Sequence, residues 1–237
     1  MNTIFSKNER YYWEYYLELE DEFYQVKKYI QFDKANYKTF SIELLKLYQA
    51  ICSEIDVIGK QIALHFNPDF KKKKHPTIRD WWFDIQDNLQ VYESVRDCVD
   101  PSKTPTSVCD VSLKNYVIDE VFSPWSNYKL EKNKDSKERN RIKLKDNCKA
   151  PSWWTDYTYV KHVRTEKDED GVLNFTKTNL KNVSNAICAL YILEISLLEL
   201  SVGENKAEAQ RFANRSLMFQ KVSNIADEDI DAMFAVD

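Results

Sequence analysis

The sequence has little glycine and little proline, with only 3 glycines and 6 prolines in 237 residues. Sandwiches and barrels contain many tight turns and usually need more of both residues. A chain with so few helix breakers is expected to form long helices. Its hydrophobic content of 43% is enough for one sizeable core. We therefore predict one mainly all-α domain over residues 1–237.

Several kinds of chemical site have no signal in the sequence. The five cysteines are widely spaced and form no CxxC pair, which argues against a zinc site. The chain also has no glycine-rich phosphate loop and no nucleophile elbow. We therefore expect no metal, no cofactor, and thiols that stay reduced in a cytosolic protein.

No charge of one sign dominates, because 34 Lys and Arg face 38 Asp and Glu, for a net charge of -4. Nucleic-acid binding would therefore need a local basic patch. The first residues contain no apolar signal core. The longest apolar run, residues 186–202, contains Glu194 and Glu199, so a buried helix is predicted rather than a membrane span. A cytoplasmic location away from membranes is the expectation.

Apolar residues at three- and four-residue steps predict the helices. The clearest helix is expected at about 41–66, with Ser41 as its N-cap. Other core helices are expected at about 7–31, 153–164 and 176–202, and shorter helices at 78–89 and 204–222. An irregular insertion at about 90–150 contains the segment VSLKNYVIDEVF, which is expected to form one or two short strands or a β-hairpin. An acidic tail covers about 223–237.

The sharpest polar cluster is formed by Lys161, His162 and Arg164, which follow the aromatic residues Trp154 and Tyr157. Arginine and lysine bind phosphate, and histidine transfers protons near neutral pH. The preceding rings are suited to stacking on bases. The cluster therefore predicts a phosphate or RNA site. The alternative is a polar helix end whose cations complement the helix dipole.

A second cluster, Ser53-Glu54-Ile55-Asp56, lies on the 41–66 helix, with Lys60 one turn further on. Asp56 and Lys60 are four residues apart and lie opposite the apolar face, whereas Glu54 lies at its edge. One interpretation is a solvated ion pair. The other is a second packed layer that covers Asp56 and makes it a buried acid beside the cationic cluster.

The 176–202 helix carries polar residues on an otherwise apolar surface. Glu194 lies in the middle of apolar residues, where a carboxylate needs either a partner or a raised pKa. Lys161, His162 or Arg164 are the candidate partners. Asn182 lies on a narrow polar stripe and is expected to hydrogen-bond to another helix.

Residues 129–149 contain nine Lys and Arg against four acids. This segment predicts either an RNA-binding patch or a solvated loop. It mixes the two signs and has no aromatic residue, so the solvated loop is favoured.

Three segments together resemble a widespread group of uncharacterised bacterial helical proteins. They are FSIELLKLYQAICSEIDVIGK (40–60), PSWWTDYTYVKHVR (151–164) and FTKTNLKNVSNAICALYIL (175–193). The group combines a Ser-Glu-x-Asp helix, a Trp-Trp-x-x-Tyr-Asn-x-Val-Lys-His-x-Arg segment and an Asn-rich apolar helix. This chain has Thr158 in place of the Asn. The group is similar to HEPN-type bundles, many of which are metal-independent RNases of toxin–antitoxin and phage-defence systems.

The resemblance implies a HEPN-like up-and-down bundle that binds or cleaves RNA. His162 would be the acid and base in attack by a ribose 2′-hydroxyl, Arg164 and Lys161 would hold the phosphate, and Glu54 or Asp56 would orient them. The usual HEPN signature, Arg followed four to six residues later by His, is absent around His162. The expected binding residues are Lys60, Tyr157, Trp154, Asn182 and Glu194. A homodimer and an antitoxin or other operon partner are the expected protein partners.

The alternative is a non-catalytic helical interaction protein. In that interpretation Lys161, Arg164 and Glu194 form a buried salt-bridge network, and the first or the last core helix faces the partner. Burial separates the two hypotheses, since an open cationic cleft favours RNA and a sealed network favours the structural role. The RNA hypothesis requires residues 54–60 and 161–164 to share one pocket.

Overall fold

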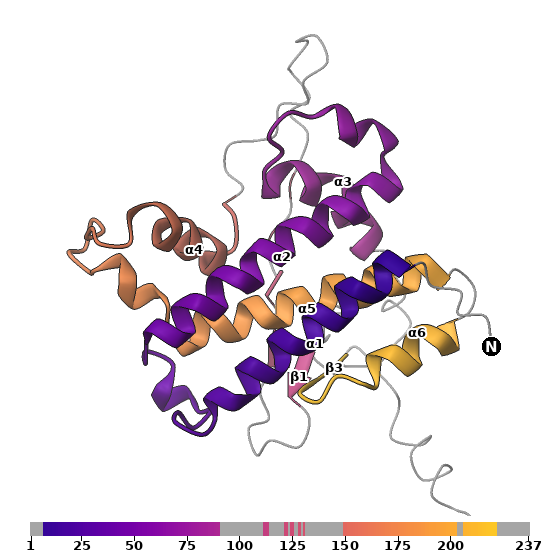
Figure 1. Ribbon diagram of the computed structural model, residues 1–237. Coiled ribbons are helices and arrows are strands. Elements are labelled where there is room, and N and C mark those ends of the chain that lie inside the picture. The colour runs from indigo at the N-terminus through magenta and orange to yellow at the C-terminus, as the bar shows by residue number, and fades with distance from the viewer. Residues whose placement is uncertain are drawn as a thin grey trace, which may run out of the picture.

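The computed structural model describes residues 7–90, 111–113, 121–122, 124–125, 128, 130, 149–202 and 206–221. Within these residues the chain is mainly helical, as predicted (Figure 1). The α-helices are α1 (Lys7–Val26), α2 (Ile42–Phe66), α3 (Ile78–Gln90), α4 (Ser152–Val163), α5 (Leu180–Val202) and α6 (Lys206–Ala213). The 3-10 helices are η1 (Lys34–Asn36), η2 (Pro68–Lys72) and η4 (Asn174–Lys177), and the strands are β1 (Val111–Leu113), β2 (Val121–Phe122) and β3 (Phe219–Lys221).

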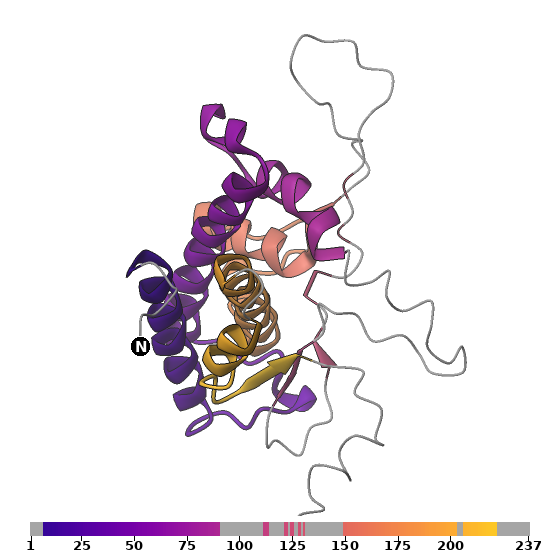
Figure 2. The same cartoon turned by 90° about the vertical axis from the view of Figure 1, so that its right-hand side faces the viewer.

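Helix α5 is the centre of the core. It is apolar on most sides, and α1, α2, α4 and α6 all pack against it (Figure 2). By length and composition α5 is apolar enough to cross a membrane, but 83% of its most apolar stretch is buried inside the protein. The prediction of a buried helix is therefore confirmed.

Helix α2 has the bounds that its sequence pattern predicts. The Ser41 hydroxyl accepts a hydrogen bond from the Leu44 amide at 3.1 Å and caps the first turn. Isoleucines at positions 51, 55, 58 and 62 form the buried face. On another side of the helix, Gly59 lies directly against the indole ring of Trp81, so α3 approaches α2 closely at this point.

The first helix is shorter than the predicted 7–31. Helix α1 ends at Val26, whose carbonyl accepts the last bonds, from Tyr29 at 2.9 Å and Ile30 at 3.0 Å. The chain then turns so that Phe32 stacks on Phe23, with ring centroids 4.9 Å apart. Burial of Phe32 against α1 is possible only if the chain folds back, so packing overrides the helical pattern.

The predicted helices at 176–202 and 204–222 also need correction. Residues 174–177 form η4, and α5 begins at Leu180, whose amide donates to the Thr39 carbonyl at 2.9 Å. The Asn179 side chain accepts from the Asn182 amide at 3.0 Å and caps the new start. Helix α6 covers only Lys206–Ala213, and residues 219–221 form β3 because they pair with β1.

The segment VSLKNYVIDEVF supplies β1 and β2, which pair antiparallel with Val111 opposite Phe122. Its expected strands are therefore confirmed. Strand β3 joins the other edge of β1, with Leu113 opposite Phe219, giving the order β2-β1-β3. The sheet thus ties the insertion to the C-terminal part of the chain.

The residues before β3 are fixed to α1 by two carboxylates. Glu20 is buried and accepts hydrogen bonds from the Ser216 hydroxyl at 2.6 Å and the Leu217 amide at 2.9 Å. Arg215 forms a two-pronged contact with Glu14, at 2.8 and 3.0 Å. The acidic tail predicted at 223–237, the basic segment 131–148 and most of the insertion lie outside the described residues.

Candidate functional site

An open cleft of about 690 Å³ lies between α2, the start of α3 and α4. We call it the α2–α4 cleft and define it by Ser53 and Asp56 of α2 and by Trp154, Tyr157 and Lys161 of α4. From the two polar stretches that the RNA hypothesis requires, the cleft brings together one residue each, Asp56 and Lys161. Four of the predicted site residues line it.

A group of tryptophans fixes α4 over this cleft. The Trp153 indole donates to the Pro124 carbonyl at 2.9 Å, and the Tyr48 hydroxyl donates to the Trp153 carbonyl. Trp154 contacts the edge of Trp81, with ring centroids 6.5 Å apart. Aromatic contacts therefore hold α4 in its place beside α2 and α3.

Asp56 makes the predicted contact with Lys60 and a second contact that the sequence did not predict. One carboxylate oxygen pairs with Lys60, and the other accepts from the Trp81 indole at 3.0 Å. The ion pair is thus confirmed. Helix α3 packs beside Asp56 without burying it, because the side chain stays 34% exposed, so the interpretation as a buried acid is wrong. Because both oxygens are occupied, Asp56 holds Trp81 in place and is poorly suited to act as a base.

Lys161 is the cation of α4 that enters the cleft. Its amine lies 5.7 Å from the centroid of the Tyr157 ring, and it has no carboxylate partner in the described part of the chain. Burial, with smaller contributions from Cys52 and Asp56, raises the pKa of Tyr157 to about 12, so its hydroxyl stays a donor. Burial also raises the pKa of the Cys52 thiol well above its ordinary value, although Lys161 opposes this. Cys52 is therefore a thiol and not a nucleophile.

The other two members of the cationic cluster lie outside the cleft. His162 and Arg164 are exposed, and neither lines the cavity. Helix α4 ends at Val163, so Lys161 and His162 are consecutive helical residues whose side chains diverge by about 100°. The Lys-His-x-Arg segment therefore contributes one side chain to the site instead of three.

Glu54 and Glu194 also lie away from the cleft, where α2 and α5 pack together. Glu194 is fully buried, and its carboxylate oxygens have no hydrogen-bond partner in the described structure. Burial, and then the charge of Glu54, raises the pKa of Glu194 well above its ordinary value. The predicted salt-bridge network of Lys161, Arg164 and Glu194 is wrong, because both cations are exposed and the Glu194 carboxyl group has no hydrogen-bond partner in the described structure. Burial without a cation favours the neutral form of this group.

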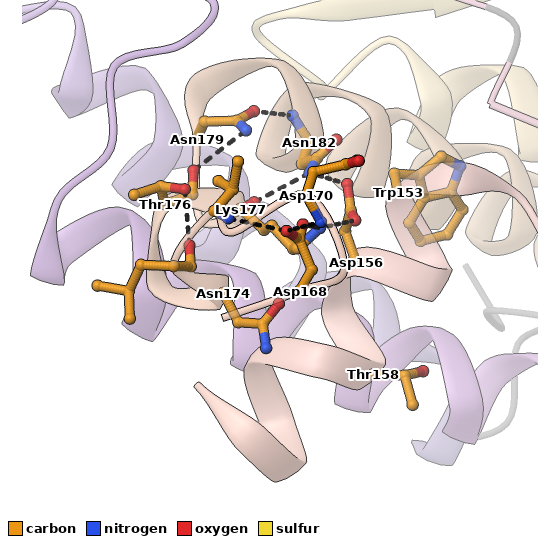
Figure 3. Close-up of polar contacts among 12 residues, drawn as sticks. Trp153, Asp156, Thr158, Asp168, Asp170, Asn174, Thr176, Lys177, Asn179 and Asn182 are labelled. Atoms are coloured by element: carbon orange, nitrogen blue, oxygen red, sulfur yellow. Dashed lines mark hydrogen bonds and ion pairs between the residues drawn. The ribbon is translucent and has the colours of Figure 1, made fainter. Parts of the chain in front are cut away.

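Asn182 makes the contact between helices that the sequence predicted. Its amide donates to Asp156 of α4 at 2.9 Å and to the Lys177 carbonyl at 2.9 Å. The Lys177 amine in turn reaches Asp168 at 2.9 Å and Asp156 at 3.3 Å (Figure 3). Burial lowers the pKa of Lys177, but these two carboxylates outweigh it and raise that pKa overall. The network joins α4 to the start of α5.

Sequence reasoning missed this network and part of the cleft. Asp156 lies between Thr155 and Tyr157, and Asp168 lies in the acidic segment EKDEDG (166–171), and neither position has a local signal for a contact with Lys177. Thr77 and Arg79 at the start of α3 also line the cleft, and neither was among the predicted site residues. Across the described ranges, no group of three or more His, Cys, Asp and Glu residues is arranged to hold a metal ion.

Comparisons with known proteins give no family or relative for this chain. No protein-family model matches it, no curated protein matches its sequence, and no solved structure matches its fold. Its resemblance to HEPN-type bundles therefore stays a prediction that depends on residues 40–60, 151–164 and 175–193.

Proposed function

We propose that this protein binds RNA or a nucleotide in the α2–α4 cleft. The observation that carries this proposal is the convergence of Trp154, Tyr157 and Lys161 on one open cavity, opposite the Ser53 hydroxyl. The lysine has no competing carboxylate partner in the part of the chain that is described. The cleft therefore combines an available positive charge with aromatic surface.

These groups suit the two parts of a nucleotide. A base that stacks on an aromatic side chain gains about 1–3 kcal/mol, whatever its sequence. A lysine ammonium neutralises a phosphate as a point charge. The net charge of -4 means that attraction to a polyanion has to come from such a local site and not from the whole protein.

The biological setting that we propose is a bacterial defence or toxin system with a HEPN-like bundle. The support for this part is the resemblance of the three segments alone. Binding is better supported than cleavage, because His162, the proposed acid and base, does not line the cleft. If RNA is cleaved, the strand has to extend from the cleft past the end of α4 to reach His162.

Charge reversal at Lys161 tests the binding proposal. Lys161→Glu places a carboxylate beside the bound phosphate, and we expect the affinity for a fluorescently labelled single-stranded RNA to fall at least tenfold, or about 1.4 kcal/mol. Fluorescence anisotropy at several salt concentrations measures this change. The slope of log K against log salt should also decrease by about 0.7, the value for one lost contact to a single-stranded phosphate.

Arg164→Glu is the matched control, since it makes the same charge change on the same helix end outside the cleft. We expect its effect to be well below that of Lys161→Glu. Equal losses in both variants would contradict a cleft-specific site and favour the exposed cluster. An unaltered wild-type anisotropy across the RNA titration would remove the proposal.

Cleavage has its own test in cells. Expression of the wild type and of His162→Ala, followed by electrophoresis of total RNA and by growth curves, separates an RNase from an RNA-binding protein. If the protein is an RNase, expression of the wild type degrades cellular RNA and lowers the number of colonies at least tenfold. His162→Ala then abolishes both effects. Intact RNA and equal growth in both strains would exclude the nuclease.

A non-catalytic interaction protein is the second candidate, and a different observation favours it. Tyr11 and Tyr15 on α1 are 58% and 44% exposed, and aromatic residues are enriched in protein interfaces. A homodimer or an antitoxin partner would cover this side of α1. A wild-type protein that binds no RNA in the titration above would leave this candidate as the better one.

A further inference from the structure

A second cavity of about 690 Å³ lies beside α4, between η1, the start of α4 and the first turns of α5. Its polar lining consists mainly of lysines and asparagines, so we call it the lysine–asparagine pocket. The lining residues that define it are Lys34, Lys38, Asn179, Lys181, Asn182 and Asn185. None of these residues lines the α2–α4 cleft.

The pocket has a positive charge balance. Three lysines line it, and Asp156 is the only carboxylate among the lining residues. Asp156 already forms an ion pair with the Lys177 amine at 3.3 Å and accepts a hydrogen bond from the Asn182 side chain at 2.9 Å. Lys38 and Lys181 have no ion-pair partner in the described part of the chain. In a protein with a net charge of -4, such an excess of positive charge around a cavity favours an anion.

The floor of the pocket is fixed before any ligand arrives. Asn182 is 93% buried, and its amide group donates both to Asp156 and to the Lys177 carbonyl (Figure 3). Its backbone amide donates to the Asn179 side chain at 3.0 Å. Asn179 in turn donates to the Thr176 carbonyl at 3.3 Å. A floor held in this way loses little conformational entropy on binding, which favours affinity.

The lining also indicates the class of anion. Lysine ammonium groups act as point charges and are common ligands of phosphate, and three of them line this cavity. Asn179 and Asn185 each use one amide hydrogen on a backbone carbonyl, of Thr176 and Lys181, so each has a second one for a ligand, whereas Asn182 uses both of its own. The Ser152 hydroxyl at the start of α4 lines the same cavity. We propose that the lysine–asparagine pocket binds the phosphate group of a phosphorylated ligand, at a site distinct from the α2–α4 cleft.

Titration of the full chain with inorganic pyrophosphate tests this site by calorimetry and by amide chemical shifts. We expect saturable binding with one site per chain. The double variant Lys38→Gln/Lys181→Gln should weaken it at least tenfold. The matched control Lys71→Gln/Lys74→Gln removes two exposed lysines just after α2, outside the pocket, and should leave the affinity within twofold.

Three results would overturn the proposal. The first is the absence of saturable binding to the wild type. The second is an equal loss in the two double variants, which would mean that pyrophosphate responds only to the overall charge. The third is loss of binding in Lys161→Glu, which would place the phosphate in the α2–α4 cleft.

A single-stranded RNA titration of Lys38→Gln/Lys181→Gln then identifies the source of the phosphate. An unchanged RNA affinity assigns the pocket to a small phosphorylated molecule, and a reduced one assigns it to the RNA backbone.

Discussion

Replacing Gly59 with alanine is expected to destabilise the protein by about 3 kcal/mol, the upper end of the usual cost of overpacking. A Cβ at this position would lie 2.6 Å from one atom of the Trp81 indole and 2.7 and 2.8 Å from two others. Trp81 cannot retreat, because it donates to Asp56 at 3.0 Å and packs against Trp154 and Trp125. Urea unfolding followed by circular dichroism measures the loss.

The sign of the change in unfolding free energy is informative, because helix propensity alone predicts that Gly59→Ala stabilises the protein. An alanine inside a helix is favoured over glycine by about 1 kcal/mol. The control is the same change in a Trp81→Leu background, where the indole no longer fills the space. Gly59→Ala should then cost much less, which gives a coupling energy of about 2 kcal/mol. Gly59→Ala could instead lower the unfolding free energy equally in the wild type and in Trp81→Leu, or make the wild type more stable. Either result would contradict the close approach of α2 and α3.

Replacing Glu194 with methionine is expected to stabilise the protein by about 2 kcal/mol at neutral pH. Glu194 is fully buried with no hydrogen-bond partner in the described structure, and such a polar group costs about 1–3 kcal/mol. Methionine has a similar volume and no polar atoms to satisfy. Thermal and urea unfolding measure the gain. A loss of stability would show that the carboxyl group makes a contact that compensates for its burial.

Glu194 also gives the stability a pH dependence with a defined sign. Burial and the charge of Glu54 raise its pKa in the folded state above the ordinary 4.5. The folded state therefore holds a proton that the unfolded state releases above about pH 4.5. This contribution is complete below that pH and is lost as the pH rises towards the folded-state pKa, by up to about 1.4 kcal/mol per pH unit.

Glu194→Gln removes this proton while keeping the shape of the side chain. We expect the decrease in unfolding free energy between pH 5 and pH 8 to be smaller in this variant than in the wild type. Glu18→Gln, at an exposed position of α1, controls for the loss of one negative charge and should keep the wild-type slope. A Glu194→Gln slope equal to that of the wild type would mean that Glu194 is ionised in the folded protein.

The helices were predictable where one local pattern decided the structure. Helix α2 combines a serine cap with an uninterrupted apolar face, so its bounds followed from the sequence. The end of α1 did not, because the chain turns in order to bury Phe32 against Phe23. Strand β3 was also missed, since its partner β1 lies about 100 residues earlier in the chain. Tertiary packing decided both errors, through a turn of nine residues in the first and a pairing of distant segments in the second.

The candidate site shows the same limit. The pairing of Asp56 with Lys60 follows from their four-residue spacing, and the isolation of Glu194 follows from its apolar neighbours. The contact of Asp56 with Trp81 joins two helices and had no local signal. Gly59 was not interpreted, although a glycine inside an apolar helix, in a chain with only three, indicates a close approach of another element. The HEPN-like function, its partners and its location stay predictions.

The order of strands in the small sheet has a consequence for biosynthesis. The central strand β1 emerges from the ribosome about 100 residues before β3, its partner on one side. At translation rates of about 5–20 residues per second, this edge of β1 stays open for about 5–20 s in every nascent chain. An open strand edge is a template for pairing with other chains. This edge of β1 is therefore a point at which misassembly can begin during synthesis, until β3 pairs with it.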